Sequence, residues 1–313
     1  MKRLAIGSLV CALLAGVTLF AQQVPVFKGT TETVPVFVTV TDGDNRLVTT
    51  LERDDFVLLD NGRRQQLAIF DNSPQPVRLI VMLDVSGSMY GNVALLRAAS
   101  RQLLARLGPE DQARLGTFGN EVFISPTFTN DAAALIAALP TEIPASAPTP
   151  LWNALDKALD AFEGVQGRRV ILVLSDGKDS GPIKFNQRYV TFVEVAERAQ
   201  REEVMIYSIG MRSRSAPGRQ TFGMNVGQRM AADLPDPGLG TIAQETGGGY
   251  IEITPRDDLA AAFERVVDEL HSQYLLGFAP PDRDGKRHKI EVKVGQTGLK
   301  ARARKNYVAP KQG

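Results

Sequence analysis

The chain has 313 residues, of which 43% are hydrophobic and 23% are charged, and its formal net charge is +1. This length and composition are typical of a globular protein with one large and one smaller domain, or with two domains of moderate size. The nearly neutral charge gives no indication of a nucleic-acid partner or of an anionic membrane surface as a partner.

The N-terminus has the composition of an export signal. Two basic residues precede an uncharged apolar run from residue 4 to residue 20, and Ala21 follows this run. The order predicts a secretory signal peptide over residues 1–21, and therefore an exported protein that is periplasmic, secreted or associated with the cell envelope. An uncleaved membrane anchor is the alternative, although a span needs about 20 apolar residues. Cys11, the only cysteine, lies inside the run, so we expect no disulfide in the mature protein.

Residues 24–76 have the pattern of a small all-β module. Residues 34–40 alternate in the manner of a half-buried strand, and a second strand-like stretch covers residues 51–59. The pair Asn61-Gly62 then separates this stretch from a third one at 66–70. Asn-Gly between two apolar runs is a strong signal for a β-hairpin.

From residue 77 to residue 272 the pattern changes to strands that alternate with helices. The stretches 79–83 and 170–174 are apolar throughout, which is typical of strands buried on both faces of a parallel sheet. We therefore predict an α/β domain with a doubly wound, mainly parallel sheet and right-handed crossovers. The other expected strands are 113–118, 121–124, 204–209 and 250–253, and the expected helices are 92–107, 131–139, 151–162, 187–202, 239–246 and 257–272.

Residues 273–310 return to strand-like patterns, at 273–278, 289–294 and 299–307. These are too few strands for an independently stable domain. We therefore expect them to complete the N-terminal β module, with the α/β domain inserted into a discontinuous β-sandwich. The segment 212–238 is rich in Gly, Pro, Arg and Ser without a clear period, and we predict a surface loop there.

Two carboxylates and three hydroxyls are predicted to meet at one edge of the α/β sheet. Asp84, Ser86 and Ser88 follow one fully apolar strand. Asp176 follows the other, and Thr149 lies in a Pro-rich loop before a predicted helix. In open α/β sheets, ligands bind beyond the carboxyl ends of the strands. A set of oxygen ligands without His or Cys favours a hard divalent cation, above all Mg²⁺, with Mn²⁺ or Ca²⁺ as alternatives.

The same residues resemble a known family. The stretch Asp84-Val85-Ser86-Gly87-Ser88 resembles the DxSxS motif of the von Willebrand factor A-type (VWA) domain, and Thr149 and Asp176 match the later threonine and aspartate of its metal-ion-dependent adhesion site. The strand and helix order of 77–272 fits this Rossmann-like domain. The flanking segments are similar to those of exported bacterial proteins that carry it.

The resemblance implies a binding protein rather than an enzyme. It implies that Ser86 and Ser88 ligate the ion directly and that Thr149 joins them in the ligand-competent state. It also implies that Asp84 and Asp176 act largely through water molecules. One coordination position is then left for an Asp or Glu carboxylate of a partner protein or peptide.

Enzymatic interpretations have weaker support in the sequence. A serine hydrolase is disfavoured because Ser86 follows Asp84 rather than the glycine of a nucleophile elbow, and because His271 and His288 are expected to be surface or helix-cap residues. A phosphatase-like, metal-dependent hydrolase that uses Asp84 stays open as an alternative, although Ser86 replaces the second aspartate of the haloacid-dehalogenase motif. Nucleotide binding lacks a phosphate-binding glycine motif. The remaining alternative is a purely structural envelope protein.

Overall fold

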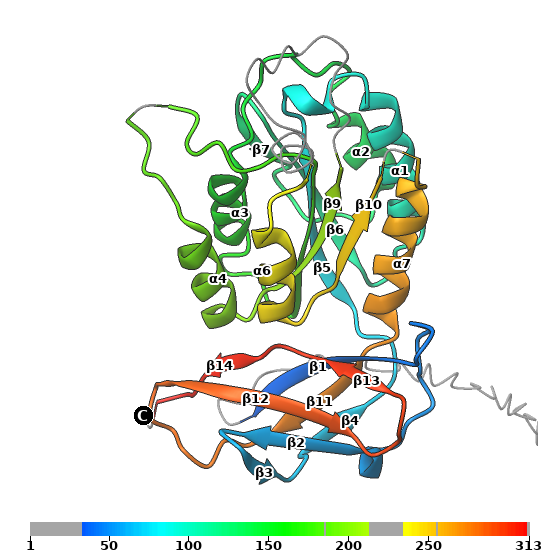
Figure 1. The fold of residues 1–313 in the computed structure, drawn as a ribbon, viewed down its shortest axis with the longest axis vertical. Helices are drawn as coiled ribbons and strands as arrows, with labels where there is room; N and C mark the ends of the chain where they lie inside the picture. Colours follow the sequence, from blue (N-terminus) through cyan, green and yellow to red (C-terminus); the bar gives the residue numbers. More distant parts are fainter. Residues whose placement is uncertain (1–32, 185, 213–233, 255, 312–313) are drawn as a thin grey trace, which may run out of the picture.

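The computed structural model describes residues 33–184, 186–212, 234–254 and 256–311. They form an α/β unit and a β module, and Figure 1 shows the α/β unit above the β module. The predicted signal peptide and most of the predicted loop 212–238 lie outside the described residues. Within the described ranges, no helix is long and apolar enough to cross a membrane.

A six-stranded sheet forms the centre of the α/β unit. Its strand order is β10-β9-β8-β5-β6-β7, and all neighbours are parallel except β6 and β7. This is the doubly wound, mainly parallel arrangement that the sequence predicts. The strands are β5 (Val77–Asp84), β6 (Gln112–Phe118), β7 (Val122–Ile124), β8 (Arg168–Ser175), β9 (Met205–Met211) and β10 (Tyr250–Ile253).

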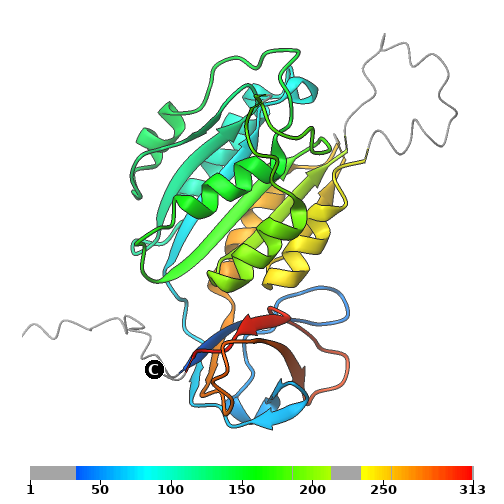
Figure 2. The same ribbon diagram turned by 90° about the vertical axis from the view of Figure 1, so that its left-hand side faces the viewer.

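Helices cover both faces of this sheet (Figures 1 and 2). In β5, Leu79 and Val81 belong to the core under α1, α2 and α7, whereas Ile80 and Met82 belong to the core under α3, α4 and α6. A strand buried on both faces must be apolar throughout, which explains the run that β5 contains. The helices are α1 (Val93–Ala105), α2 (Ala132–Ala137), α3 (Leu151–Asp160), α4 (Phe192–Arg201), α6 (Gly238–Thr246) and α7 (Leu259–His271).

Helix α4 begins five residues later than the periodicity predicts. Thr191 is its N-cap: the Thr191 hydroxyl accepts a hydrogen bond from the Glu194 backbone N–H, and the Glu194 carboxylate accepts one from the Thr191 backbone N–H. This capping box satisfies two backbone donors that a helix start leaves free. The cap therefore determines the start of the helix, and residues 187–191 precede it as a loop.

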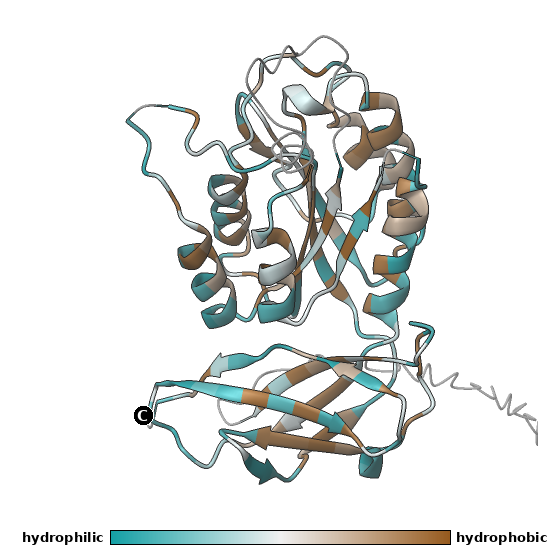
Figure 3. Ribbon diagram, in the orientation of Figure 1, coloured by the Kyte–Doolittle hydropathy of each residue, from teal (hydrophilic) through white to brown (hydrophobic). Residues whose placement is uncertain are grey.

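Strands from both ends of the chain build the β module. Antiparallel pairing joins β1 to β11 and β2 to β12, in two four-stranded sheets of order β13-β1-β11-β4 and β14-β12-β2-β3. Both sheets contribute to one apolar core, and Figure 3 shows hydrophobic stretches along their strands. The strands are β1 (Val34–Thr41), β2 (Phe56–Asp60), β3 (Arg63–Gln65), β4 (Ile69–Asp71), β11 (Tyr274–Phe278), β12 (Arg287–Val294), β13 (Lys300–Arg302) and β14 (Asn306–Val308).

Two strand predictions in the β module are wrong in detail. The hairpin at Asn61-Gly62 exists, with positive φ at both residues, but its return strand is β3 and the later stretch becomes β4 in the other sheet. The predicted strand 299–307 is divided into β13 and β14, again in different sheets. The chain bends between them because Arg304 contacts Glu203 of the α/β unit and Lys305 N–H donates to the Glu245 carbonyl.

Buried polar contacts join the two units. Gln273, which connects α7 to β11, donates to the Thr39 hydroxyl over 2.7 Å and to the Tyr207 hydroxyl over 3.2 Å. At Gly247, which has a φ of +86°, a Cβ atom would lie only 2.5 Å from the backbone N of Arg304, so a side chain there would separate the units.

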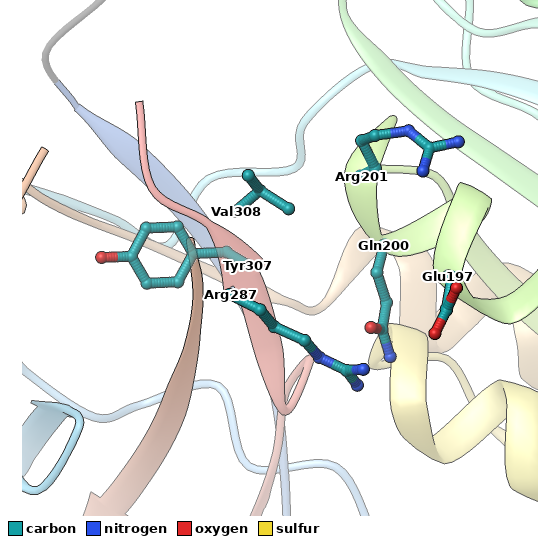
Figure 4. Close-up of a pocket in the computed structure, with 6 residues that line it drawn as sticks. All are labelled: Glu197, Gln200, Arg201, Arg287, Tyr307 and Val308. Atoms are coloured by element: carbon teal, nitrogen blue, oxygen red, sulfur yellow. The ribbon is translucent and has the colours of Figure 1, made fainter. Parts of the chain in front are cut away.

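A small cavity of about 170 Å³ lies in the same interface. Figure 4 shows Arg287 of β12 extending toward Gln200 of α4. The other residues that line the cavity are Glu197, Arg201, Tyr307 and Val308.

Candidate metal centre

The predicted site residues follow two neighbouring strands of the α/β sheet. Asp84 is the last residue of β5, and Asp176 follows directly after Ser175, the last residue of β8. The two strands are parallel neighbours, with Leu83 opposite Leu174. Both carboxylates therefore leave the sheet at the same edge.

Asp84 is fully buried, and both of its oxygens accept hydrogen bonds. One oxygen accepts from the Ser86 backbone N–H over 2.8 Å, and the other accepts from the Ser175 hydroxyl. The first bond turns the chain immediately after β5. A short 3₁₀ helix, Gly87–Met89, then brings Ser88 next to Ser86.

A chain of hydrogen-bonded oxygens connects the two loops. The hydroxyl oxygens of Ser86 and Ser88 lie 3.1 Å apart, and the Ser88 hydroxyl donates to Asp176 over 2.6 Å. Adjacent oxygen ligands of an octahedral Mg²⁺ lie about 3.0 Å apart, since each is roughly 2.1 Å from the ion. The spacing of these side-chain oxygens is thus close to that of neighbouring cation ligands.

Thr149 lies against the second loop. Gly177 directly follows Asp176, and a Cβ atom at this position would lie only 2.9 Å from the Thr149 Oγ1. The Thr149 N–H donates to the Ser180 hydroxyl, and the Ser180 N–H donates to the Thr149 carbonyl, each over 2.9 Å. The Gly87 N–H also donates to the Ala147 carbonyl over 2.9 Å, which ties the first loop to the Thr149 loop. The structure therefore brings all three loops together.

Burial makes this pair of carboxylates electrostatically unfavourable. Burial is the main cause that raises the pKa of Asp84 to about 7, and the negative charge of Asp176 adds to it, against the hydrogen bonds from Ser175 and Ser86. Burial also raises the pKa of Asp176, which the Ser88 hydroxyl opposes. Among the described residues, no Lys, Arg or His side chain forms an ion pair with either carboxylate.

The donor set fits a small hard cation. Carboxylate and hydroxyl oxygens are ligands that Mg²⁺ prefers, and a divalent charge would offset the repulsion between Asp84 and Asp176. Ser88 is exposed, whereas Ser86 and Thr149 are buried, so the set is open to solvent on the Ser88 side. Nowhere in the described part of the chain is a group of three or more His, Cys, Asp or Glu side chains arranged to hold a metal ion, and the set described here has two carboxylates and three hydroxyls.

Both histidines hydrogen-bond aspartates outside this site. His271, the last residue of α7, lies 2.8 Å from an Asp111 oxygen. The prediction that His288 is a surface or cap residue is wrong, because it is only 3% exposed and lies 2.9 Å from an Asp60 oxygen in the β module. Strand β12 carries it inward between its charged neighbours, where Asp60 satisfies its ring nitrogen.

Two supporting residues, Ser175 and Gly177, were missed by the sequence reasoning. Ser175 is fully buried and orients Asp84, and Gly177 leaves room for Thr149. Asp179, in the same loop, is partly buried and accepts hydrogen bonds from the Trp152 and Gly181 backbones. A serine at the buried end of an apolar strand was a usable signal for Ser175, whereas the role of Gly177 depends on a contact between distant loops.

One family model matches this chain, and several solved structures are similar to it. The family model of the von Willebrand factor type A domain matches residues 79–245. Among solved structures, an aerotolerance-related membrane protein from Bacteroides fragilis NCTC 9343 is 17% identical, with 62% of this chain and 98% of that chain covered and a TM-score of 0.42. The vWF domain of the type V pili tip protein Mfa5 from Porphyromonas gingivalis is 14% identical, with 62% and 95% covered and a TM-score of 0.46. A search of curated proteins gave no match. Because the family model covers more than half of its residues, the chain belongs to the von Willebrand factor type A domain family.

Proposed function

We propose that the chain is an exported binding protein that holds a divalent cation, foremost Mg²⁺, and uses it to bind a carboxylate of a partner protein or peptide. The ligand set is Asp84, Ser86, Ser88, Thr149 and Asp176. The observation that carries the proposal is the chain of closely spaced oxygens between two buried carboxylates that have no basic partner within the described residues. Domains of this family typically serve protein–protein interaction or adhesion, which supports a binding role.

The residues of the site have different tasks in this proposal. Ser86 and Ser88 offer neutral hydroxyl oxygens, so direct ligation by them leaves positive charge on the cation. Asp84 already accepts hydrogen bonds from the Ser86 N–H and the Ser175 hydroxyl, which hold its carboxylate next to the serines. In the cation-bound state it contributes its negative charge without direct ligation. When bound, the cation supplies the positive charge that attracts an external Asp or Glu. The exposed side of the site, at Ser88, is where that carboxylate would enter.

Binding rather than catalysis is the better account of this geometry. A serine nucleophile needs a general base within hydrogen-bond reach, and each of the two histidines is held by an aspartate elsewhere. Turnover of 4-nitrophenyl phosphate or 4-nitrophenyl acetate by the purified protein would contradict a pure binder. Catalysis at this site would be shown if Ser86→Ala abolished the turnover while the affinity for divalent cations survived.

The export assignment rests on the sequence of residues 1–21. We expect secretion to remove this segment, and N-terminal sequencing of the protein recovered from an expressing bacterium measures the cleavage position. Recovery of the uncleaved chain in the cytoplasm would contradict the assignment.

A peptide selection tests the binding proposal and requires no identified partner. A random peptide library is selected on the immobilised protein in MgCl₂, and each enriched peptide is then measured in MgCl₂ and in EDTA. We expect binding that requires Mg²⁺ and that is lost when one Asp or Glu of the peptide is changed to its amide. Ser86→Ala should abolish binding, whereas Ser73→Ala, an exposed serine of the linker before β5, should retain it. Equal binding in EDTA, or no effect of the amide substitutions, would contradict the proposal.

A further inference from the structure

A second cavity lies between the α/β unit and the β module, at the opposite end of the sheet from the candidate metal centre. Its volume is about 450 Å³, which is within the usual range of small-molecule sites. The first residues of β8, the linker before β5, the end of α4 and strands β1 and β11 contribute to its wall. The charged residues that line it are Arg78, Glu110, Arg168, Arg169, Glu203 and Arg304.

Two of the arginines are neighbours across parallel strands. Arg78 of β5 is the register partner of Arg169 of β8, so the two side chains leave the same face of the sheet about 5 Å apart. Like charges in such a position are destabilising unless something lies between them. Both side chains donate to backbone carbonyls, of Glu110 and Glu202 respectively, and neither forms an ion pair within the described ranges.

Arg168, the first residue of β8, is a buried cation. It is 8% exposed, and burial lowers its pKa to about 10, although Tyr207 and Asp111 act in the opposite direction. Its terminal nitrogens donate to the Leu270 carbonyl and to Gln273. Its Nε atom is buried and has no acceptor among the residues that the structure describes. A buried charge normally has a partner of opposite sign, and no carboxylate of the described residues pairs with this guanidinium.

Glu203 in the wall and Asp111 near it already have other partners. Glu203 pairs with Arg304 over 3.0 Å, and Arg304 also donates to the Pro35 carbonyl, so this pair links the two units. Asp111, which attracts Arg168 from a distance, accepts hydrogen bonds from Val77 N–H and Gly108 N–H and contacts His271. Among the described residues that line the cavity, Glu110 is thus the one carboxylate left to offset the charges of Arg78, Arg168 and Arg169.

The rest of the wall is apolar. Phe37 lies under the Arg168 guanidinium, with 4.4 Å between the guanidinium carbon and the ring centroid. Pro35 and Leu275 of the β module and Val165 and Met205 of the α/β unit also face the cavity. A charged group bound at the arginines would therefore have space for an apolar body beside it.

We propose that this interdomain cavity binds a small organic anion, with a carboxylate or phosphate group at the paired Arg78 and Arg169 and an apolar body against the apolar residues of the wall. Arg168 leaves the other face of β8 and adds positive charge to the same wall. The anion supplies the negative charge that the arginines lack, and its apolar body displaces water from the wall between the two units. The proposal does not depend on the metal centre, which lies beyond the other ends of the same strands.

Three probes that share a naphthalene ring test the proposal on the full chain. Calorimetric titrations use 2-naphthoate, 2-naphthyl phosphate and the neutral 2-naphthamide, all in EDTA so that a carboxylate cannot bind through a divalent cation. We expect saturable binding of at least one of the two anions and binding at least tenfold weaker for the amide. The comparison of the two anions distinguishes a carboxylate ligand from a phosphate ligand.

The double variant Arg78→Gln/Arg169→Gln tests the location, because both arginines are only partly buried and Arg168 stays in place. We expect the affinity for the anion to fall at least tenfold. The matched control Arg64→Gln/Arg101→Gln removes the same charge from exposed positions on other elements and should leave the affinity unchanged. Thermal unfolding without probe verifies that both double variants are folded.

Three results would overturn the proposal. They are no saturable binding of either anion, equal affinity for 2-naphthamide, and equal affinity of the two double variants. If the Arg78→Gln/Arg169→Gln protein does not fold, the single variant Arg169→Gln is compared with Arg101→Gln under the same criteria.

Discussion

The two ends of strands β5 and β8 carry opposite charges. The carboxyl ends lead into Asp84 and Asp176, which are buried without a basic partner in the described chain, and the amino ends carry Arg78, Arg168 and Arg169. A parallel sheet collects the corresponding ends of its strands at one edge, so residues of one charge type can gather at each end.

The ends differ in what surrounds the charge. At the acidic end the neighbours are short loops with neutral hydroxyls, and Ser88 is exposed, which suits a small hydrated cation. At the basic end the β module encloses the arginines against apolar residues, which suits a larger anion. The sheet provides the position of both sites, and the connecting loops and the second unit decide what each can bind.

The largest expected effect comes from Asp84→Asn. A carboxyl whose pKa rises from 3.8 to about 7 destabilises the folded state by up to ~4 kcal/mol at alkaline pH. We expect the variant, measured in EDTA at about pH 8, to be more stable than the wild type by about 2 kcal/mol, because the amide must still be buried. Urea unfolding gives this difference. The same variant should lose all stabilisation by Mg²⁺, whereas the exposed-site control Asp54→Asn should change neither quantity.

The pH dependence of Mg²⁺ affinity is the second prediction. Because burial and Asp176 raise the pKa of Asp84 to about 7, the cation must displace a proton below that pH. We expect the dissociation constant for Mg²⁺ to increase about tenfold from about pH 8 to about pH 6. The stability of the metal-free protein changes in the opposite sense, since the folded state binds the extra proton and loses stability as pH rises from about 4 to 7. A Mg²⁺ affinity that does not vary with pH would contradict the role of Asp84.

A smaller effect is expected at the amino ends of the strands, from Asp111→Asn. Burial alone would raise the pKa of Asp111, but hydrogen bonds from His271, Val77 N–H and Gly108 N–H outweigh burial and lower it. The carboxylate therefore contributes stability above about pH 4, which is lost as pH falls through its lowered pKa. We expect the variant to be less stable by about 1 kcal/mol at neutral pH. Melting curves between about pH 2 and pH 6 should show a weaker acid dependence than those of the wild type.

The smallest effect is expected at Arg106, an exposed residue whose ion pairs can be compared with the buried contacts of Asp111. Arg106 bridges Glu264 and Asp268 on α7, each over 3.0 Å, but its side chain is 44% exposed. Exposed ion pairs contribute little, so Arg106→Ala should cost about 0.5 kcal/mol, and less in high salt. If Arg106→Ala lost as much stability as Asp111→Asn, exposure to solvent would not explain why the two contacts differ.

The apolar strands and the order of the α/β unit were predictable from the sequence. A strand such as β5 is recognisable because burial on both faces leaves no polar position along it. The boundaries were less predictable where side-chain contacts decide them: Thr191 and Glu194 determine the start of α4, and contacts of Arg304 with the other unit divide the last predicted strand. The contacts of Arg304 join residues far apart in the sequence, and no local pattern records them.

The site residues were predictable because they directly follow strands whose ends meet. Asp84 and Asp176 could be placed at one edge from the strand pattern alone. The arginines at the other ends of the same strands were not singled out, because their burial depends on the β module, which covers them from both ends of the chain. The proposed role of these arginines depends on how the two units pack together, and the sequence pattern of either unit alone does not indicate that packing.

The central claim is that the oxygens of Asp84, Ser86, Ser88, Thr149 and Asp176 share one cation. Calorimetric titration of the metal-free protein with MgCl₂ tests it most directly. We predict one Mg²⁺ per chain, a matching rise in melting temperature, and loss of both in Ser86→Ala but not in Ser73→Ala. The absence of binding and of any melting shift at about 10 mM Mg²⁺, Mn²⁺ or Ca²⁺, above the weak end of extracellular cation sites, would contradict it.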